Sequence, residues 1–182
     1  GAWRWAPDGS FLVHEVTREP EPDPRDVKRV MDPADRQPQG RKRVHLVQAF
    51  VPGGYARRLT AGPVSPESWR ISPDGGSLLF FLSAPDLTRR PYYGSELWLL
   101  DLGTLEASRL LDEPWIGGAE WTVDGDALLL RGSPSAFDGL GLNLPAGVQP
   151  NDYGGQLYLW DLAAREARPL TRTFAPDVRR AH

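Results

Sequence analysis

The chain has 182 residues, of which 40% are hydrophobic and 25% charged, and its formal net charge is −3. This composition is typical of a globular domain, and the slight negative charge argues against a nucleic acid as a partner. The absence of cysteine excludes disulfides, thiol nucleophiles and cysteine-bound metals. No apolar stretch is long enough for a membrane helix, so no membrane partner is expected.

The first predicted unit, residues 1–62, begins with a hairpin that turns at Pro7-Asp8-Gly9. Proline presets φ at such a turn, and glycine accepts the positive φ that the hairpin needs. Residues 17–43 are rich in proline and charge, so they predict a long loop that buries little apolar surface. The strands of this unit are predicted at Trp3–Ala6, Phe11–Val16, Val44–Phe50 and Tyr55–Thr60.

The second predicted unit, residues 63–113, contains the clearest hairpin of the chain, with a turn at Ser72-Pro73-Asp74-Gly75. The apolar run that follows is short and bounded by turn residues, which is typical of a buried strand. A loop is predicted at residues 85–94. The strands are predicted at Ser68–Ile71, Ser77–Leu82, Glu96–Leu102 and Ala107–Leu111.

The third predicted unit, residues 114–172, repeats this plan and has a long loop at residues 132–155. Its strand at 156–162 shares the pattern polar-Leu-aromatic-Leu-x-Asp-Leu with the strand at 96–102. Residues 173–182 are expected to lead into a further unit. The strands are predicted at Ala119–Thr122, Ala127–Arg131, Gln156–Leu162 and Ala167–Thr171, and no helix beyond a short turn is expected.

The three units have the length and composition of β-propeller blades. Asp74 and Asp124 occupy the same turn position and lie 124 − 74 = 50 residues apart, and four-stranded units of ~40–50 residues are typical of blades. A generic antiparallel sandwich is the alternative. The prediction is an all-β chain with about three blades of four antiparallel strands, forming one partial, open propeller. Because residue 1 is not methionine, the chain is expected to be a piece of a longer protein.

The connections of the predicted blades alternate between two faces, because successive strands are antiparallel. The turns between first and second strands and between third and fourth strands are short. The connections between second and third strands are long in every unit and therefore share the other face. Binding sites are concentrated on variable loops of a rigid scaffold, so this long-loop face is the predicted working face.

With these patterns in view, the chain resembles the β-propeller of the prolyl oligopeptidase family of serine peptidases, in its dipeptidyl peptidase IV-like branch. The Ser72-Pro73-Asp74-Gly75 hairpin is the generic mark and also occurs in TolB-like propellers. The resemblance extends over essentially the whole chain but only about three blades. The more specific stretches are Ser133–Gly139, Asn151–Tyr153, Gln156–Leu162 and Leu170–Pro176.

In that family the propeller is not the catalyst, and a separate α/β-hydrolase domain carries the nucleophile. The resemblance therefore implies a non-catalytic propeller that gates access to the hydrolase domain of its parent chain and helps to position short peptides. The alternative is a TolB-like protein-interaction propeller with no hydrolase partner. Three blades cannot close a ring, so the isolated chain is expected to self-associate.

The chain has no hydrolase nucleophile motif. The segment Gly132-Ser133-Pro134-Ser135-Ala136 lacks the second glycine of Gly-x-Ser-x-Gly. Of the three histidines, His14 and His45 lie on predicted strands as packed or edge residues, and His182 ends the chain. No cofactor, metal site or catalytic residue is predicted, although the resemblance implies that the parent protein is a serine peptidase. Asp101 and Asp161 are interpreted as turn residues.

Two groups of residues are weak candidates for substrate binding. Carboxylates near the first long loop can bind a peptide ammonium group by charge-assisted hydrogen bonds, although a solvated acidic loop is the favoured interpretation. Arginine and tyrosine are enriched in contact sites, and they cluster in the loop of the second unit. The candidates are Glu15, Glu19, Glu21, Arg89, Arg90, Tyr92 and Tyr93.

Overall fold

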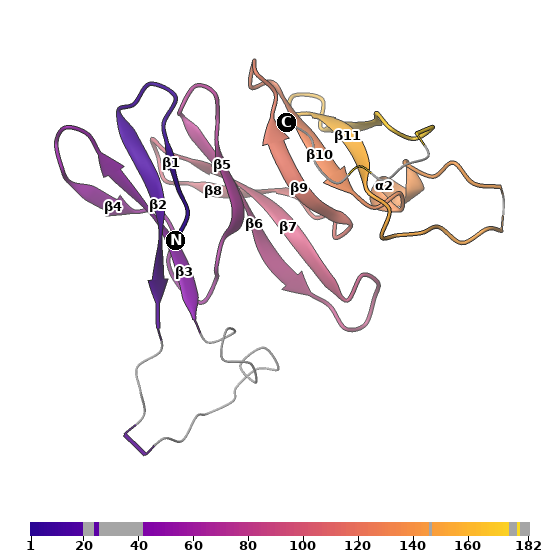
Figure 1. Ribbon diagram of the computed structural model, residues 1–182, viewed down its shortest axis with the longest axis horizontal. Helices are drawn as coiled ribbons and strands as arrows, with labels where there is room; N and C mark the ends of the chain where they lie inside the picture. Colours follow the sequence, from indigo (N-terminus) through magenta and orange to yellow (C-terminus); the bar gives the residue numbers. More distant parts are fainter. Residues whose placement is uncertain (20–23, 26–41, 146, 175–177, 179–182) are drawn as a thin grey trace. The chain divides into compact units, whose positions relative to one another are not determined.

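The computed structural model describes residues 1–19, 24–25, 42–145, 147–174 and 178 (Figure 1). The chain divides into two compact units, residues 1–66 and 67–182. In the described residues it forms three four-stranded antiparallel sheets and almost no helix. The predicted fold class, blades of four antiparallel strands, is therefore confirmed. No described helix has the length and apolar character that a membrane crossing requires.

The first unit contains sheet 1, in which the strands follow chain order. The pairing of β2 with β3 runs from Phe11–Phe50 to Arg18–Arg43, so both strands extend further into the predicted long loop than the sequence indicated. Most of the connection between them lies outside the described residues. The strands are β1 (Trp3–Trp5), β2 (Phe11–Arg18), β3 (Arg43–Phe50) and β4 (Ala56–Arg58).

The second unit begins with sheet 2, also in chain order. The pairing of β6 with β7 continues to Pro85 opposite Tyr93, which shortens the predicted loop to residues 86–92. Tyr93 is therefore the first residue of a strand, where the sequence predicted a loop residue. The strands are β5 (Glu67–Ile71), β6 (Ser77–Pro85), β7 (Tyr93–Asp101) and β8 (Ala107–Leu111).

Sheet 3 completes the second unit, with β9 and β12 at its two edges. The only helical segment in the described part of the chain is α2 (Ala136–Gly139), a single turn in which Phe137 and Asp138 have positive φ. This agrees with the expectation of no helix beyond a short turn. The strands are β9 (Ile116–Trp121), β10 (Ala127–Gly132), β11 (Gln156–Asp161) and β12 (Glu166–Pro169).

Sheets 2 and 3 pack face to face and share one hydrophobic core. Alternate residues of each strand point to the same side, so one face of sheet 2 contributes Leu79, Phe81 and Leu97. The facing side of sheet 3 contributes Leu128, Leu130, Tyr158 and Trp160. Each fully buried side chain of this size stabilises the folded state by roughly 1.5–3 kcal/mol. This core holds the two sheets as one scaffold.

A bidentate ion pair adds to this packing. The Nε and Nη2 atoms of Arg70 on β5 lie 2.6 and 2.5 Å from the two carboxylate oxygens of Glu120 on β9. Two parallel hydrogen bonds of this kind fix orientation as well as distance. The pair therefore sets the position of the first strand of one sheet beside the first strand of the next.

The repeated aspartates have the same local role in both sheets of the second unit. Asp101 Oδ1 accepts hydrogen bonds from the backbone N–H groups of Gly103 and Thr104, at 2.8 and 2.7 Å. Asp161 Oδ1 accepts from Ala163 and Ala164 at 2.9 and 2.7 Å. The interpretation of both as turn residues is confirmed. The bonds from Thr104 and Gly103 also lower the pKa of Asp101, because they favour its ionised form.

Candidate functional site

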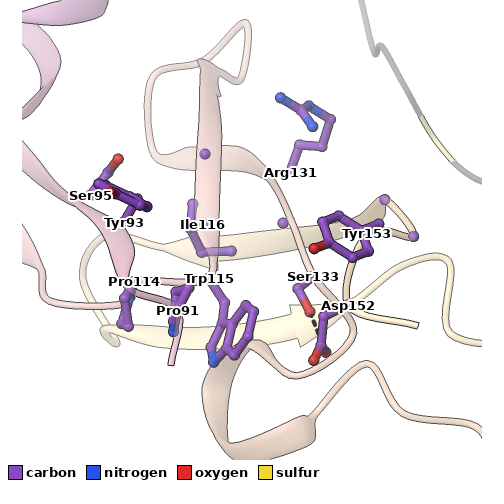
Figure 2. Close-up of a pocket in the computed structure, with 14 residues that line it drawn as sticks. Pro91, Tyr93, Ser95, Pro114, Trp115, Ile116, Arg131, Ser133, Asp152 and Tyr153 are labelled. Atoms are coloured by element: carbon purple, nitrogen blue, oxygen red, sulfur yellow. Dashed lines mark hydrogen bonds between the residues drawn. The ribbon is translucent and has the colours of Figure 1, made fainter. Parts of the chain in front are cut away.

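The candidate site is a cavity of about 260 Å³ in the second unit, where the connection between β8 and β9 meets the ends of β7 and β10. Figure 2 shows its lining side chains. The residues after β10 and before β11 come from the long connection that the sequence placed on the working face. The side chains that line the cavity include Pro91, Tyr93, Ser95, Pro114, Trp115, Ile116, Arg131, Ser133, Asp152 and Tyr153.

A small hydrogen-bond network forms one wall of the cavity. The carboxylate of Asp152 accepts hydrogen bonds from the hydroxyls of Ser133, at 2.9 Å, and Ser135. The Tyr158 hydroxyl donates to the backbone carbonyl of Ser133 at 2.7 Å. Burial, with a smaller contribution from the Glu113 carboxylate, raises the pKa of Tyr158 to about 12. Tyr158 therefore stays neutral and remains a hydrogen-bond donor at physiological pH.

Close approach of β9 and β10 requires glycine at position 132. A Cβ atom there would lie 2.5 Å from both the Cδ1 atom of Ile116 and the backbone oxygen of Trp115. The Ile116 methyl group can move aside, but the Trp115 oxygen is a backbone atom, so a side chain at position 132 would force the backbone to shift. Gly132 therefore allows the segment carrying Trp115 and Ile116 to lie against the end of β10 and close this side of the cavity.

Among the described residues that line the cavity, Arg131 is the only cation. It pairs with Gly118 of β9, and its Nε atom lies 3.4 Å from the position that a Cβ of Gly118 would occupy. Within the described part of the chain, no hydrogen bond or ion pair holds its guanidinium group. Two tyrosines on the cavity wall are strongly exposed: Tyr93 at 80% and Tyr153 at 98%.

The acidic candidates do not form a site in the described residues. Glu15 lies within β2, opposite Leu46 and not at the mouth of the loop, and its Oε2 atom accepts a hydrogen bond from the Ala2 backbone at 2.8 Å. Glu19 is exposed and forms an ion pair with Lys42 at 2.7 Å. Glu21 lies outside the described residues. Glu15 and Glu19 thus each have a partner within the first unit.

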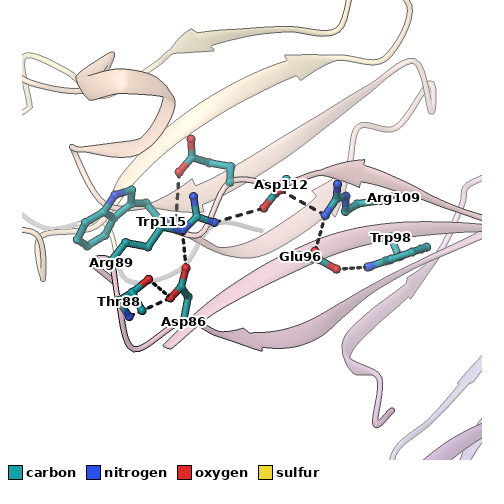
Figure 3. A network of polar contacts seen from close by, with 9 residues as sticks. Asp86, Thr88, Arg89, Glu96, Trp98, Arg109, Asp112 and Trp115 are labelled. Atoms are coloured by element: carbon teal, nitrogen blue, oxygen red, sulfur yellow. Dashed lines mark hydrogen bonds and ion pairs between the residues drawn. The ribbon is translucent and has the colours of Figure 1, made fainter. Parts of the chain in front are cut away.

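The arginine and tyrosine candidates separate into different environments. Arg89 belongs to an ion-pair network (Figure 3), in which it lies 3.2 Å from Asp86 and 3.9 Å from Asp112. Arg90 and Tyr92 are exposed at the tip of the hairpin. Tyr93 alone of the seven candidates lines the cavity.

The network in Figure 3 continues along sheet 2. Asp112 also pairs with Arg109 at 3.3 Å, and Arg109 pairs with Glu96 at 2.6 Å. Glu96 accepts a further hydrogen bond from the Trp98 indole at 3.0 Å. The alternating charges neutralise one another, so ion pairing within the sheet explains the cluster of charged residues in this region.

The two described histidines, His14 and His45, lie on neighbouring strands of sheet 1. His45 is 5% exposed and its Nδ1 atom has no hydrogen-bond partner in the described structure. Burial, followed by the positive charge of Arg58, lowers its pKa and so favours the neutral ring. His14 lies on β2, half-buried. Among the described residues no three His, Asp or Glu side chains are grouped as metal ligands.

The sequence interpretation missed Arg131, although the repeat contained a signal for it. Register places Ala127 opposite Asp161 as it places Ser77 opposite Asp101, so the two strands β6 and β10 can be aligned. Arg131 then corresponds to Phe81, a buried core residue. A charge at a position where the preceding blade has a buried aromatic residue indicates a departure from the structural repeat.

No model of a known protein family matches the sequence, and no curated protein matches it either. Solved structures with a similar fold do exist. TolB from Acinetobacter baumannii aligns with a TM-score of 0.55 and 18% identity over 91% of this chain and 30% of its own. Acylaminoacyl peptidase from Pyrococcus horikoshii aligns with a TM-score of 0.52 and 17% identity over 88% of this chain and 24% of its own.

A third structure, the β-propeller domain of the Trilobed protease from Pyrococcus furiosus, aligns with a TM-score of 0.51 and 18% identity. The match includes 89% of this chain and 39% of that domain. The chain thus spans well under half of each of these proteins. At such identities the likeness concerns the fold alone, and it includes both peptidase propellers and TolB. The chain therefore has the fold of β-propeller blades.

Proposed function

We propose that this chain is the non-catalytic propeller portion of a serine peptidase of the prolyl oligopeptidase family, in the dipeptidyl peptidase IV-like branch. In the parent protein it gates access to an α/β-hydrolase domain and helps to position short peptides. The observation that carries this proposal is the cavity on the long-loop face. Its wall contains Ser133, Asp152 and Tyr153, which belong to two of the four stretches that resemble the family more specifically.

The alternative is a TolB-like protein-interaction propeller without a hydrolase partner. The TM-score with TolB from Acinetobacter baumannii, 0.55, is similar to that with the peptidase from Pyrococcus horikoshii, 0.52, so the fold is compatible with both functions. The Ser-Pro-Asp-Gly hairpin is common to both groups and does not separate them. The peptidase is favoured by the stretches Ser133–Gly139 and Asn151–Tyr153, which contribute to the cavity wall and resemble that family.

The proposal includes the organisation of the chain as three blades, residues 1–62, 63–113 and 114–172, with 173–182 leading into a further blade. Because an incomplete ring leaves strand edges and apolar sheet faces uncovered, we propose that the isolated chain self-associates. Light scattering of the purified 182-residue chain should give a mass above that of a monomer. A stable, concentration-independent monomer would contradict this part of the proposal.

The peptidase proposal is tested on the parent gene and its product. We expect the coding sequence after residue 182 to encode further blades and then a Gly-x-Ser-x-Gly segment. The full-length protein should react with a fluorophosphonate probe and cleave short peptides faster than long unfolded chains. A reading frame that ends after the propeller, or a full-length protein that does not react with the probe, would favour the TolB-like alternative.

A further inference from the structure

The charge balance of the cavity favours an anionic ligand. Asp152, the only carboxylate in its lining, already accepts two hydroxyl hydrogen bonds and forms no ion pair with Arg131 in the described structure. Arg131 has no partner there, whereas Arg70, Arg89 and Arg109 each bind a carboxylate. A guanidinium group presents a planar fork of donors that matches a carboxylate in two parallel hydrogen bonds. The cavity thus has one unused charged group, and it is a cation.

Two glycines of β9, Gly117 and Gly118, lie near Arg131. The guanidinium group lies against the backbone of Gly118, directly opposite, where a Cβ atom would be 3.4 Å from its Nε atom, and open space lies beside Gly117, which lines the cavity. β9 is also an edge strand of sheet 3, so one side of its backbone has no strand partner within the sheet. An extended peptide can add to such an edge by main-chain hydrogen bonds.

The exposed tyrosines favour a peptide over an inorganic anion. Tyr153 and Tyr93 present large, rigid amphipathic rings to solvent beside the cavity, and such rings gain contact energy when an apolar side chain covers them. The volume of about 260 Å³ is below the ~300–1,000 Å³ of most sites for drug-sized ligands. The ligand that enters is therefore short.

We infer that the cavity binds the carboxylate group of a short peptide, with Arg131 as the cationic anchor and the rings of Tyr153 and Tyr93 as the contact surface for an apolar side chain. This inference deepens the proposed function and rests on it for the choice of peptides as ligands. It assigns recognition to a residue on the third sheet, outside the acidic and arginine-tyrosine groups indicated by the sequence.

The experiment is an NMR titration of the 182-residue chain with three peptides of similar size. N-acetyl-Gly-Phe has a free C-terminal carboxylate, N-acetyl-Gly-Phe-amide has none, and N-acetyl-Asp-Phe-amide has only a side-chain carboxylate. We expect the first or the third to shift the signals of cavity residues, with about 10- to 100-fold weaker binding of the neutral amide, the range expected for charge-assisted hydrogen bonds. Comparison of the two acidic peptides identifies which carboxylate is bound.

Variants locate the interaction. Arg131→Gln should reduce the affinity for the acidic peptide by about 10-fold or more and leave the neutral amide unaffected. Tyr153→Ser should weaken both. The matched control is Arg168→Gln, which removes the same charge from an exposed position on β12, and it should change neither affinity. Arg131→Lys, which retains the charge but loses the fork, should bind with intermediate affinity.

Three results would overturn the inference: equal binding of the acidic and neutral peptides, an unchanged affinity in a folded Arg131→Gln variant, or no binding of any peptide up to about 10 mM, beyond the ~1 mM of very weak complexes. If Arg131→Gln does not fold, the comparison of peptides on the unaltered chain still decides. Failure here leaves the proposed function standing, because that proposal depends on the parent gene and on the hydrolase activity of its product.

Discussion

Arg89 and Arg131 are both in the second unit, but their surroundings differ. Arg89 lies among the carboxylates of Asp86 and Asp112, in a network that continues to Arg109 (Figure 3). Arg131 lies beside a glycine at the wall of a cavity and has no partner in the described structure (Figure 2). The comparison shows that a cluster of arginine and tyrosine in sequence does not by itself predict a binding site. What distinguishes the two arginines is that the charge of Arg89 is already paired with carboxylates, whereas that of Arg131 is not.

The largest expected effect comes from removing the core under both regions. Leu130→Ala deletes a side chain that is 0% exposed in the core shared by sheets 2 and 3. We expect the free energy of unfolding to fall by about 2–5 kcal/mol, because a cavity remains after the methyl groups are lost. Urea denaturation followed by tryptophan fluorescence measures this change.

The control for this variant is Leu129→Ala, one residue away on the same strand and only half-buried. It should cost clearly less. Equal costs for the two variants would contradict the assignment of Leu130 to the common core.

The next effect is specific to the wall of the Arg131 cavity. Tyr158→Phe removes the hydroxyl that donates to the Ser133 carbonyl, which keeps only its hydrogen bond from the Ala136 backbone N–H. We expect a loss of about 0.5–1.5 kcal/mol in the free energy of unfolding, the usual contribution of one hydrogen bond, with little change in the network around Arg89. Chemical denaturation and NMR spectra of the two regions would show this difference.

The same variant has a predicted pH signature. Tyr158 ionises at a pKa of about 12 in the folded chain, compared with 10.0 for an ordinary tyrosine. The stabilisation of its neutral form is fully present below pH 10 and is lost as the pH rises through the folded pKa. The free energy of unfolding should therefore decrease less between pH 8 and pH 11 in Tyr158→Phe than in the unaltered chain. An identical decline in both would show that Tyr158 is not the group responsible.

A smaller effect is expected at the centre of the Arg89 network. Asp112→Asn removes the charge that faces both Arg89 and Arg109. Because these side chains are largely exposed, we expect the free energy of unfolding to fall by only about 0.5–1 kcal/mol. The loss should shrink at high salt, which screens exposed charges. A salt-independent loss of several kcal/mol would mean that the network is more buried than the structure shows.

The smallest effect on stability separates the two arginines directly. Arg89→Gln should cost about 0.2–1 kcal/mol and leave peptide binding unchanged, because its ion pairs are exposed and lie outside the cavity lining. Arg131→Gln should leave the unfolding free energy nearly unchanged and lose the acidic peptide. Thermal denaturation together with the NMR titration compares them, and the reverse pattern would invalidate the distinction between the two regions.

Much of the fold could be predicted from the sequence, because strands and turns depend on local patterns. The turn at Asp101 is an example: its carboxylate caps the backbone within a few residues of itself. The strand at Ala107–Leu111 has the predicted limits. Ends of strands beside long connections were less predictable, because the extension of β6 and β7 to Pro85 and Tyr93 depends on pairing across the sheet and not on apolar alternation.

The candidate site was predicted only in part. The long-loop face and the stretches containing Ser133 and Asp152 were indicated by the sequence, and Tyr93 was among the candidates. Their assembly into one cavity was not, because it depends on segments from two sheets that meet through the common core. Local patterns do not indicate ion pairs between residues as distant in sequence as Arg70 and Glu120.

The sequence by itself determined the repeated four-stranded units, their tight turns and the division into short and long connections, because each depends on residues that are neighbours in the chain. The pairing of Arg89 with Asp86 is local, but only the tertiary structure decided that Arg89 also reaches Asp112 and that Arg131 has no partner in the described residues. The physical reason is that ion pairing is a short-range interaction between residues distant in sequence, such as Arg70 and Glu120. Those distances are set when the two sheets pack against each other.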